Sequence, residues 1–492
     1  MLLAIDQGTT GTTCLVFDPE GELVGRAYRE FGQHFPRPGW VEHDATEIWE
    51  VSHAVAGEAL EDAGVVPGEL EAIGITNQRE TVVCWDPSTG EPLHRALVWQ
   101  DRRTAARCAE LRSAGHRAAI RVKTGLVVDP YFSATKMEWL LRNVDGLRER
   151  ARDGRAVFGT IDSWLLFKLT GEHVTDASNA SRTMLLDIGA VAWDGELCEL
   201  FGVPERTLPE VRPSCGEIGR TSAETFHGHA VPVAGVAGDQ QAALFGQRCL
   251  DPGLGKNTYG TGSFVLQNAG AAAPRVPEGL LGTIGWQVGA HTTYALEASI
   301  FVTGAAVQWL RDGLGVIEQA AETEELAAGL DGNDGVYFVP ALTGLGSPHW
   351  DPYARGTIVG LTRGTGRAHL ARAALEAMAY QTVDAVRAME AASGEPLAEL
   401  RADGGATVNR WLMQFQADVL GVPVTVPEVS ETTALGAALL AGVGAGLLTL
   451  DGVRSLGEPK AVYEPRMSED ERATLLDGWQ RALQRARQWA EE

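Results

Sequence analysis

The sequence is short of positive charge. Its 492 residues include 41 Lys and Arg but 65 Asp and Glu, which gives a formal net charge of −24. A chain with this balance is not expected to have a broad basic surface to neutralise nucleic-acid phosphates, which argues against a nucleic-acid partner. Small phosphates are not excluded, because backbone N–H groups, helix N-termini and metal ions can hold them.

CxxC cysteine pairs and the pattern typical of a leader segment are also lacking. Six cysteines are scattered without a CxxC pair, which excludes a typical zinc site or disulfide framework: Cys14, Cys84, Cys108, Cys198, Cys215 and Cys249. Reduced, buried thiols are typical of the cytoplasm. The N-terminus "MLLAIDQGTT" enters a strand pattern without a basic region followed by a long apolar stretch. We therefore expect no secretory signal and a cytoplasmic protein.

No apolar run is long enough to predict a membrane span. The longest candidate, "ALGAALLAGVGAGLLTL" at 434–450, has 17 uncharged residues rich in Gly and Ala. A span needs about 20 predominantly apolar residues. The segment instead predicts a buried helix that packs closely through small side chains.

Strand-like and helical patterns alternate along the chain, which predicts an α/β fold. Helical patterns cover 44–64, 131–144, 300–314 and 369–393. Each half opens with a strand, a Gly/Thr turn and a strand, and the Asp-Pro-Gly turn at 251–253 marks a boundary between them. We expect two similar domains, 1–250 and 251–492, that face a central cleft.

The familiar nucleotide-binding patterns GxGxxG and GxxxxGK[ST] are absent, so a nucleotide would have to bind another way. The turn "DQGTTGTT" at 6–13 offers Gly8, with the hydroxyls of Thr9 and Thr10, to a phosphate, and Asp6 stands where Mg²⁺ could bind. The turn "NTYGTGSF" at 257–264 offers a second such loop around Thr261. Each turn by itself is equally compatible with a plain β-turn.

Three further stretches carry candidate chemistry. The turn "DGGA" at 403–406 exposes backbone before a helix, which would admit a flat base or simply reverse the chain. The "NQRE" turn places Arg79 beside Glu80, a donor fork and an acceptor that suit a polyol, although adjacent opposite charges are usually a solvated surface pair. Asp239 follows a strand and precedes a helix, where it could cap the helix or accept a proton.

Together these stretches resemble the FGGY carbohydrate kinases, and the likeness covers nearly the whole chain. The motifs that carry it include "AIDQGTTGTTCLVFD", "GITNQRETVVCWD", "AGDQQAALFGQ", "NTYGTGSF" and "FVPALTGLGSPHWDPYARG". The resemblance implies two ribonuclease-H-like domains, as in actin and hexokinase, with ATP and substrate in the cleft between them.

The resemblance is strongest to family members that act on glycerol, and it assigns roles at the polyol site. Arg79 and Glu80 would bind the hydroxyls, and Asp239 would act as the catalytic base as well as a substrate contact. Trp99 and Phe264 would form an apolar wall, with Tyr131 and Gln240 completing the hydrogen bonds. The implied reaction is ATP-dependent phosphorylation of glycerol to sn-glycerol 3-phosphate.

The resemblance also implies a nucleotide site with Mg²⁺ held near Asp6 and Asp239. The residues that would contact ATP are Gly8, Thr9, Thr10, Gly11, Thr12, Thr261, Gly304, Gln308, Gly405, Ala406 and Asn409. One departure is the tripeptide 11–13, Gly-Thr-Thr, where many of the relatives that act on glycerol read Ser-Ser-Arg.

Two alternatives stay open at this point. One is a family member that phosphorylates another polyol or a ketose, and the other is an actin-like ATPase without small-molecule kinase activity. The resemblance also implies a homo-oligomer, a dimer or tetramer, since family members often form these and symmetric association is common.

Overall fold

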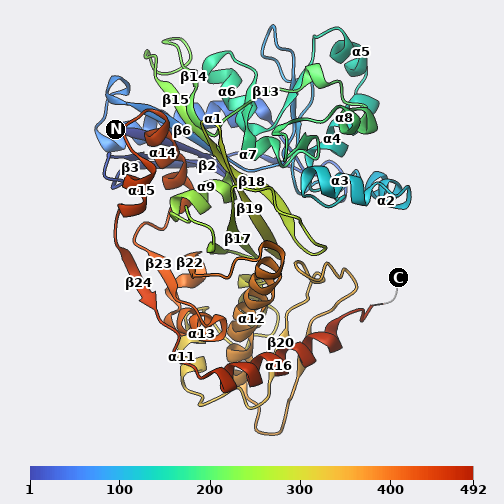
Figure 1. Cartoon of the computed structure of the whole chain (residues 1–492), viewed down its shortest axis with the longest axis vertical. Coiled ribbons are helices and arrows are strands. Elements are labelled where there is room, and N and C mark those ends of the chain that lie inside the picture. The colour runs from blue at the N-terminus through green and yellow to red at the C-terminus, as the bar shows by residue number, and fades with distance from the viewer. Residues whose placement is uncertain (491–492) are drawn as a thin grey trace.

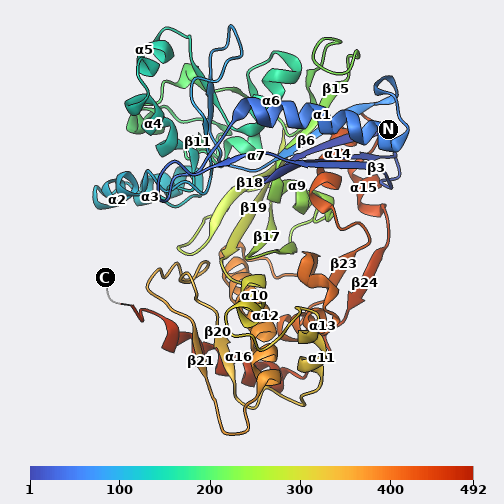
Figure 2. The same cartoon turned by 180° about the vertical axis from the view of Figure 1, so that it is seen from behind.

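A single mixed sheet of thirteen strands runs through the protein (Figures 1 and 2). The computed structural model describes residues 1–490. In sheet order the strands are β24 (Pro459–Tyr463), β23 (Val424–Pro427), β22 (Glu399–Gly404), β16 (Leu254–Tyr259), β17 (Ser263–Gly270), β19 (His291–Ile300), β18 (Leu281–Val288), β14 (Cys215–Arg220), β15 (Pro232–Gly238), β6 (Ala72–Asn77), β1 (Leu2–Gln7), β2 (Gly11–Phe17) and β3 (Leu23–Glu30).

The two-fold plan seen in the sequence recurs in the strand pairing. β1 is antiparallel to β2 and parallel to β6, while β16 is antiparallel to β17 and parallel to β22. Each hairpin turn is therefore one of the two Gly/Thr turns, and each lies at the same end of its strand group. This arrangement confirms the predicted α/β fold with two related halves.

Helices pack on this sheet and around it. The longer ones are α1 (Ala45–Ala63), α4 (Ser133–Asn143), α6 (Ile161–Thr170), α12 (Arg367–Ser393), α13 (Arg410–Leu420), α14 (Thr432–Gly444) and α16 (Glu469–Ala486). The shorter ones are α2 (Ala105–Ser113), α3 (Arg117–Thr124), α5 (Leu147–Arg152), α7 (Ala177–Ala180), α8 (Gly195–Phe201), α9 (Asp239–Gly246), α10 (Gly304–Asp312), α11 (Glu322–Ala328) and α15 (Leu450–Ser455).

Short strands outside the main sheet complete the described fold as one three-stranded sheet and four pairs. They are β4 (Gln33–His34), β5 (Glu42–His43) and β8 (Ala96–Leu97); β7 (Val83–Trp85) with β9 (Val157–Gly159); β10 (Val174–Asp176) with β13 (Glu210–Arg212); β11 (Leu186–Asp187) with β12 (Ala192–Trp193); and β20 (Tyr337–Val339) with β21 (Thr357–Val359). The helix predicted over 300–314 begins only at Gly304, because Ile300 is the buried last residue of β19 and pairs with Ser263.

The Gly/Ala-rich segment forms the buried helix α14 only as far as Gly444. The predicted helix over 434–450 was therefore too long, since residues 445–449 lie outside it and are largely exposed. A Cβ on Gly74 of β6 would overlap the carbonyl of Ala437, and a Cβ on Gly436 would overlap the carbonyl of Ala242 in α9. The helix and its neighbours therefore approach backbone to backbone. Among residues 1–490, no helix combines the length and apolar character that crossing a membrane requires.

All six cysteines are free and buried, as the scattered spacing predicts. Burial raises the pKa of the Cys84 thiol to about 12, so this sulfur stays protonated at neutral pH.

Candidate active site

The central pair of candidate residues lies where two neighbouring parallel strands end. β6 ends at Asn77 and β15 ends at Gly238, and these two residues are direct partners in the sheet. The turn after β6 carries Arg79, and α9 begins at Asp239 directly after β15. Parallel strands of α/β sheets place ligand-binding residues beyond their carboxyl ends. The Nε of Arg79 lies 2.9 Å from Oδ1 of Asp239, so the two predicted residues meet.

Arg79 is the hub of the site, and its side chain is only 2% exposed. Its guanidinium donates to Glu297 of β19 at 2.5 Å, to Gln241 of α9 at 3.3 Å and to the Tyr131 hydroxyl at 3.3 Å. The solvated surface pair that the sequence left open is therefore excluded. A buried arginine held by this many acceptors has one fixed orientation.

Glu80 has an unusual backbone. Its φ angle is 62°, in the left-handed region that glycine favours, although the residue is buried. Ser133 donates to the Glu80 carbonyl at 3.0 Å, and the Nε of Arg182 donates to Oε1 at 2.7 Å. Strained conformations of this kind persist where the surroundings hold them and are concentrated at functional sites.

Asp239 is the first residue of α9, and the N-cap position belongs to Gly238. Its Oδ1 accepts the backbone N–H of Gln240 at 2.6 Å as well as the Arg79 contact, and 34% of the side chain is exposed. Burial raises the pKa of the Asp239 carboxyl, and the nearby Arg79 lowers it. The cap interpretation is therefore wrong in position, because Gly238 and not Asp239 is the N-cap, although Oδ1 of Asp239 still accepts one N–H of the first turn. The base interpretation stays open, since the second oxygen remains available.

The aromatic wall is partly assembled. The Trp99 ring meets the Tyr131 ring edge to face with 5.5 Å between centroids, and the Trp99 Nε1 donates to the Thr9 hydroxyl at 2.9 Å. Phe264 of β17 is half-buried and packs against the core cluster that contains Phe245. The structure thus brings Trp99 and Tyr131 together beside the first turn, whereas Phe264 lies on the neighbouring half.

The first Gly/Thr turn is closed by the Gly8 N–H, which donates to the Gly11 carbonyl at 2.9 Å. Thr10 at its tip is exposed. Thr12 is buried, and its hydroxyl is 3.1 Å from the hydroxyl of Ser52 on α1. The tip of the turn is therefore accessible to a ligand, while the Thr12 side chain is engaged with the helix.

The second turn is built against the start of α10. The Gly304 N–H donates to the Gly260 carbonyl at 3.1 Å, and a Cβ on Gly304 would come within 2.5 Å of that oxygen. Thr261 and Gln308 are exposed on this surface. The close approach explains why glycine occupies position 304.

The third stretch leaves an open space before α13. Gly404 has a φ of 89°, and a Cβ on Gly405 would meet no atom within 4 Å. The half-buried Ala406 follows it. Asn409 caps α13 by accepting the Leu412 N–H at 2.9 Å and also donates to Thr323 at 3.3 Å. The space beside Gly405 is therefore bounded by small residues and could accept a flat ring.

Asp6, the residue before the last of β1, is half-buried and lies near other carboxylates. Burial, with the charges of Asp239 and Glu431, raises its pKa to about 7. Within residues 1–490 there is no group of three or more His, Cys, Asp or Glu side chains arranged to hold a metal. Mg²⁺ typically keeps several waters and binds through one or two carboxylates and substrate phosphates, so the pair Asp6 and Asp239 fits this ion.

Sequence reasoning missed four buried residues of the site, namely Arg182, Gln241, Lys256 and Glu297. The Nζ of Lys256 contacts Oε1 of Gln240 and lies 2.7 Å from the Thr258 hydroxyl, and burial lowers its pKa to about 8. One signal was available: Lys256 is the one charged side chain of the strand sequence LGKNTY, and Glu297 stands between Leu296 and Ala298 in an apolar part of β19. A buried charge needs a partner, which identifies such positions as part of a network.

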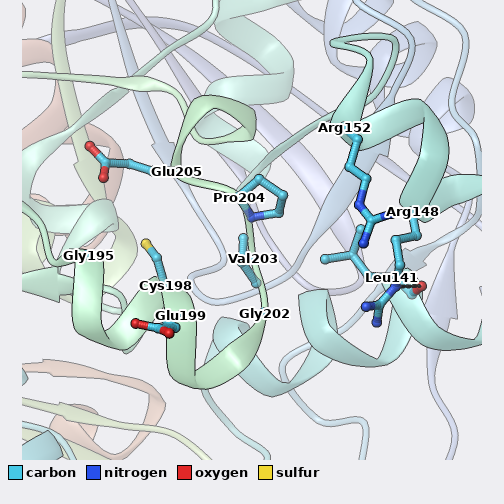
Figure 3. Close-up of a pocket in the computed structure, with 10 residues that line it drawn as sticks. All are labelled: Leu141, Arg148, Arg152, Gly195, Cys198, Glu199, Gly202, Val203, Pro204 and Glu205. Atoms are coloured by element: carbon cyan, nitrogen blue, oxygen red, sulfur yellow. Dashed lines mark hydrogen bonds between the residues drawn. The ribbon is translucent and has the colours of Figure 1, made fainter.

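A separate surface pocket lies away from the predicted site residues. It has a volume of about 470 Å³ and opens between α4, α5 and α8, with Arg148 and Arg152 on one wall and Glu199 on another (Figure 3). None of the predicted site residues lines it.

The fold and the site together define a two-domain kinase of small hydroxylated compounds. The model of the "FGGY family of carbohydrate kinases, N-terminal domain" matches residues 1–246, and that of the C-terminal domain matches residues 255–445. The chain belongs to the FGGY family of carbohydrate kinases.

Among the most similar relatives are kinases of glycerol, and a sugar kinase is also similar in structure. The glycerol kinase of Dechloromonas aromatica is 55% identical, with 99% of this chain and 98% of the relative covered, and that of Geobacter sp. strain M21 is 56% identical with 99% of each covered. The structure of Plasmodium falciparum glycerol kinase with ADP has a TM-score of 0.95 at 37% identity, covering 99% of this chain and 98% of that one. The xylulose kinase of Rhodospirillum rubrum has a TM-score of 0.87 at 27% identity, covering 98% and 97%. The expected family is thereby confirmed.

Proposed function

We propose that the chain transfers the terminal phosphoryl group of ATP to glycerol and forms sn-glycerol 3-phosphate. The observation that carries the proposal is the buried Arg79–Glu80 turn held 2.9 Å from Asp239. It presents a donor fork, an acceptor and a carboxylate to one small ligand. Full-length relatives that are 55–56% identical and named glycerol kinase support the same substrate.

In the proposed reaction, Arg79 and Glu80 hold two hydroxyls of glycerol, and the terminal hydroxyl faces Asp239. As the O–P bond forms, the proton of that hydroxyl passes to the Asp239 carboxylate. The bond between the γ-phosphorus and the bridging oxygen breaks, and ADP leaves. Phosphoryl transfer needs mainly in-line placement and charge neutralisation, which this arrangement supplies without a covalent intermediate.

The Gly/Thr turns would contact the phosphates through Gly8, Thr9, Thr10 and Gly11 on one side and Thr261 on the other. The open space beside Gly405 would accept adenine, with Gly304, Gln308, Ala406 and Asn409 around the nucleotide. Asp6 and Asp239 would hold Mg²⁺, which neutralises phosphate charge when bound. For the remaining predicted contacts, Gln240, Tyr131, Trp99 and Phe264 would complete the polyol site and Thr12 would support the first turn through its Ser52 contact.

The experiment is an ADP-release assay on the purified protein with glycerol, erythritol, xylulose or no acceptor. We expect release that depends on glycerol and a product that sn-glycerol-3-phosphate dehydrogenase oxidises. Preference for xylulose or erythritol would favour another FGGY substrate. ATP hydrolysis that is independent of every acceptor would favour an actin-like ATPase.

Three organisational proposals accompany the reaction. The chain divides into domains 1–250 and 251–492, supported by the related hairpins β1–β2 and β16–β17. It works in the cytoplasm, supported by six free, buried cysteines. It assembles as a dimer or tetramer, which light scattering on the purified protein tests.

A further inference from the structure

Behind the polyol-binding turn lies a closed ring of four buried charges. Arg182 donates through Nε to Glu80 at 2.7 Å and through Nη2 to Glu297 at 3.0 Å. Arg79 donates to Glu297 at 2.5 Å, and the Nε of Arg79 lies 3.9 Å from Oε1 of Glu80, which closes the ring. None of the four side chains is more than 2% exposed. Positive and negative charges alternate, so no member faces only its own sign.

The site residues reach this ring from well-separated parts of the chain. Arg182 follows α7, and Glu297 lies on β19. The amides of Asn77 and Asn179 hydrogen-bond each other reciprocally at 3.0 and 3.1 Å, which joins the end of β6 to α7. Asn77 precedes Arg79 by two residues, and Asn179 precedes Arg182 by three. The two arginines are therefore held relative to each other before any ligand arrives.

The ring determines how Glu80 meets a ligand. Arg182 occupies Oε1, whereas no donor among residues 1–490 hydrogen-bonds Oε2. Glu297 draws the Nη groups of Arg79 to one side, while the Nε of Arg79 points to Asp239. With one oxygen fixed and the other free, Glu80 has a single direction in which to accept a hydrogen bond from a substrate hydroxyl.

We propose that Arg182 and Glu297 are positioning residues of the polyol site, which fix Glu80 and Arg79 as a charge-balanced pair so that they meet the substrate hydroxyls in one geometry. Neither residue touches the substrate in this arrangement, because each acts through its neighbour in the ring. The proposal deepens the proposed function and rests on it for the identity of the ligand as a polyol.

The decisive variant is Arg182→Lys, which keeps the charge but loses the fork that reaches both glutamates. We expect the KM for glycerol to rise about 10- to 100-fold, the range for losing hydrogen bonds to charged groups, while the KM for ATP changes less than about twofold. A wild-type glycerol KM in a folded Arg182→Lys protein would overturn the proposal.

Arg372→Lys is the matched control. Arg372 and Glu376 form a buried ion pair at 2.7 Å within α12, outside the proposed site. This variant should lose a similar amount of thermal stability and keep the wild-type glycerol KM. An equal rise in KM in both variants would mean that loosening any buried pair suffices, which contradicts a positioning role.

A double variant separates positioning from folding. Arg182→Gln with Glu297→Gln removes one charge of each sign, so Arg79 remains paired with Glu80 and Asp239. We expect the melting temperature to recover relative to either single variant while the glycerol KM stays raised. Recovery of both quantities together would show that the pair serves stability alone.

The pH dependence of kcat/KM is a further measurement, and a change in protein stability alone would not alter it. Glu80 faces Arg79, Arg182, Glu297, Tyr131 and Lys136, and the pKa of its carboxyl is raised by burial and lowered by the two arginines. Arg182→Gln should therefore shift the acid limb of kcat/KM for glycerol to higher pH, and an unmoved limb counts against the proposal.

If the wild type uses another polyol, the same comparison applies to that polyol. If it uses none, the proposed function fails first and is recognised by the wild-type assay alone.

Discussion

Replacing Asp239 by Asn tests the proposed base directly. The amide keeps an oxygen that can accept from the Arg79 Nε, at 2.9 Å in the wild type, and from the Gln240 N–H, at 2.6 Å. It removes the ability to take up a proton. Because the local hydrogen bonds survive, we expect a protein that folds normally and binds glycerol with little change in KM.

The size of the effect follows from the role. A positioned general base contributes about 10²- to 10⁴-fold to a rate, which corresponds to about 3–5 kcal/mol of the activation barrier. We expect kcat to fall within that range. The wild type should also lose activity on acidification at a pH above the ordinary Asp value of about 3.9, because burial raises the pKa of Asp239.

The assay is coupled ADP release at saturating glycerol and MgATP, with thermal melting as the check on folding. Asp44→Asn is the control, since Asp44 accepts the Thr46 N–H at 2.9 Å as the N-cap of α1 and Asn serves equally at that position. If Asp239→Asn keeps more than about a third of the wild-type kcat while folded, the base assignment is refuted, because a general base contributes at least about 10²-fold.

Three further predictions concern packing, charge and pH. Gly436→Ala should lower the free energy of unfolding by about 1–3 kcal/mol, because the added Cβ overlaps the α9 backbone. In the control Gly195→Ala, the added Cβ meets no atom within 4 Å, so the free energy of unfolding should change by less than about 0.5 kcal/mol. Equal urea midpoints for the two variants would contradict this prediction. Lys256→Met should lower kcat/KM for glycerol about tenfold, because the Lys256 ammonium holds Gln240. Since the Lys256 pKa is lowered to about 8, the wild type should lose activity above about pH 8 and the variant should not. A loss of activity above about pH 8 that persists in the variant would rule this out. The Asp162 pKa is raised from 3.8 to about 6, so the folded state binds this proton more tightly than the unfolded state does. This group's contribution to the free energy of unfolding is therefore fully present below about pH 4, and about 3 kcal/mol is lost as the pH rises through about 6. Asp162→Asn should lack that contribution in urea titrations between pH 4 and 6, and an unchanged slope would refute it.

Much of the fold was readable in the sequence because local patterns and the tertiary structure agree. The Gly/Thr turns sit between strands as predicted, and the Gly/Ala-rich segment forms the close-packed helix α14. The predicted helix over 300–314 was too long, because a run of apolar residues does not distinguish the end of a buried strand from the start of a helix. Ile300 belongs to the strand for a tertiary reason, its pairing with Ser263.

The candidate site was predicted in part. Arg79, Glu80 and Asp239 follow the ends of strands, where charged residues indicate a possible ligand site. The structure brings these three residues together. Arg182 and Glu297 lie 102 and 217 residues from Glu80 in the chain, and no local pattern joins them. Their partnership arises only when the sheet places β19 beside the turn, so it required the three-dimensional structure.

One strand links the two ends of the proposed reaction. Glu297 anchors Arg79, and three residues further along β19 Ile300 pairs with Ser263, next to the second Gly/Thr turn. Three residues of strand span about 10 Å. The anchor of the polyol turn and the support of one phosphate loop are therefore fixed on the same rigid element. A shift of one residue in the β17–β19 register would turn Glu297 to the other face and remove it from Arg79. The long antiparallel pairing of β19 with both β17 and β18 opposes such a shift, which keeps the polyol and the phosphoryl donor in line.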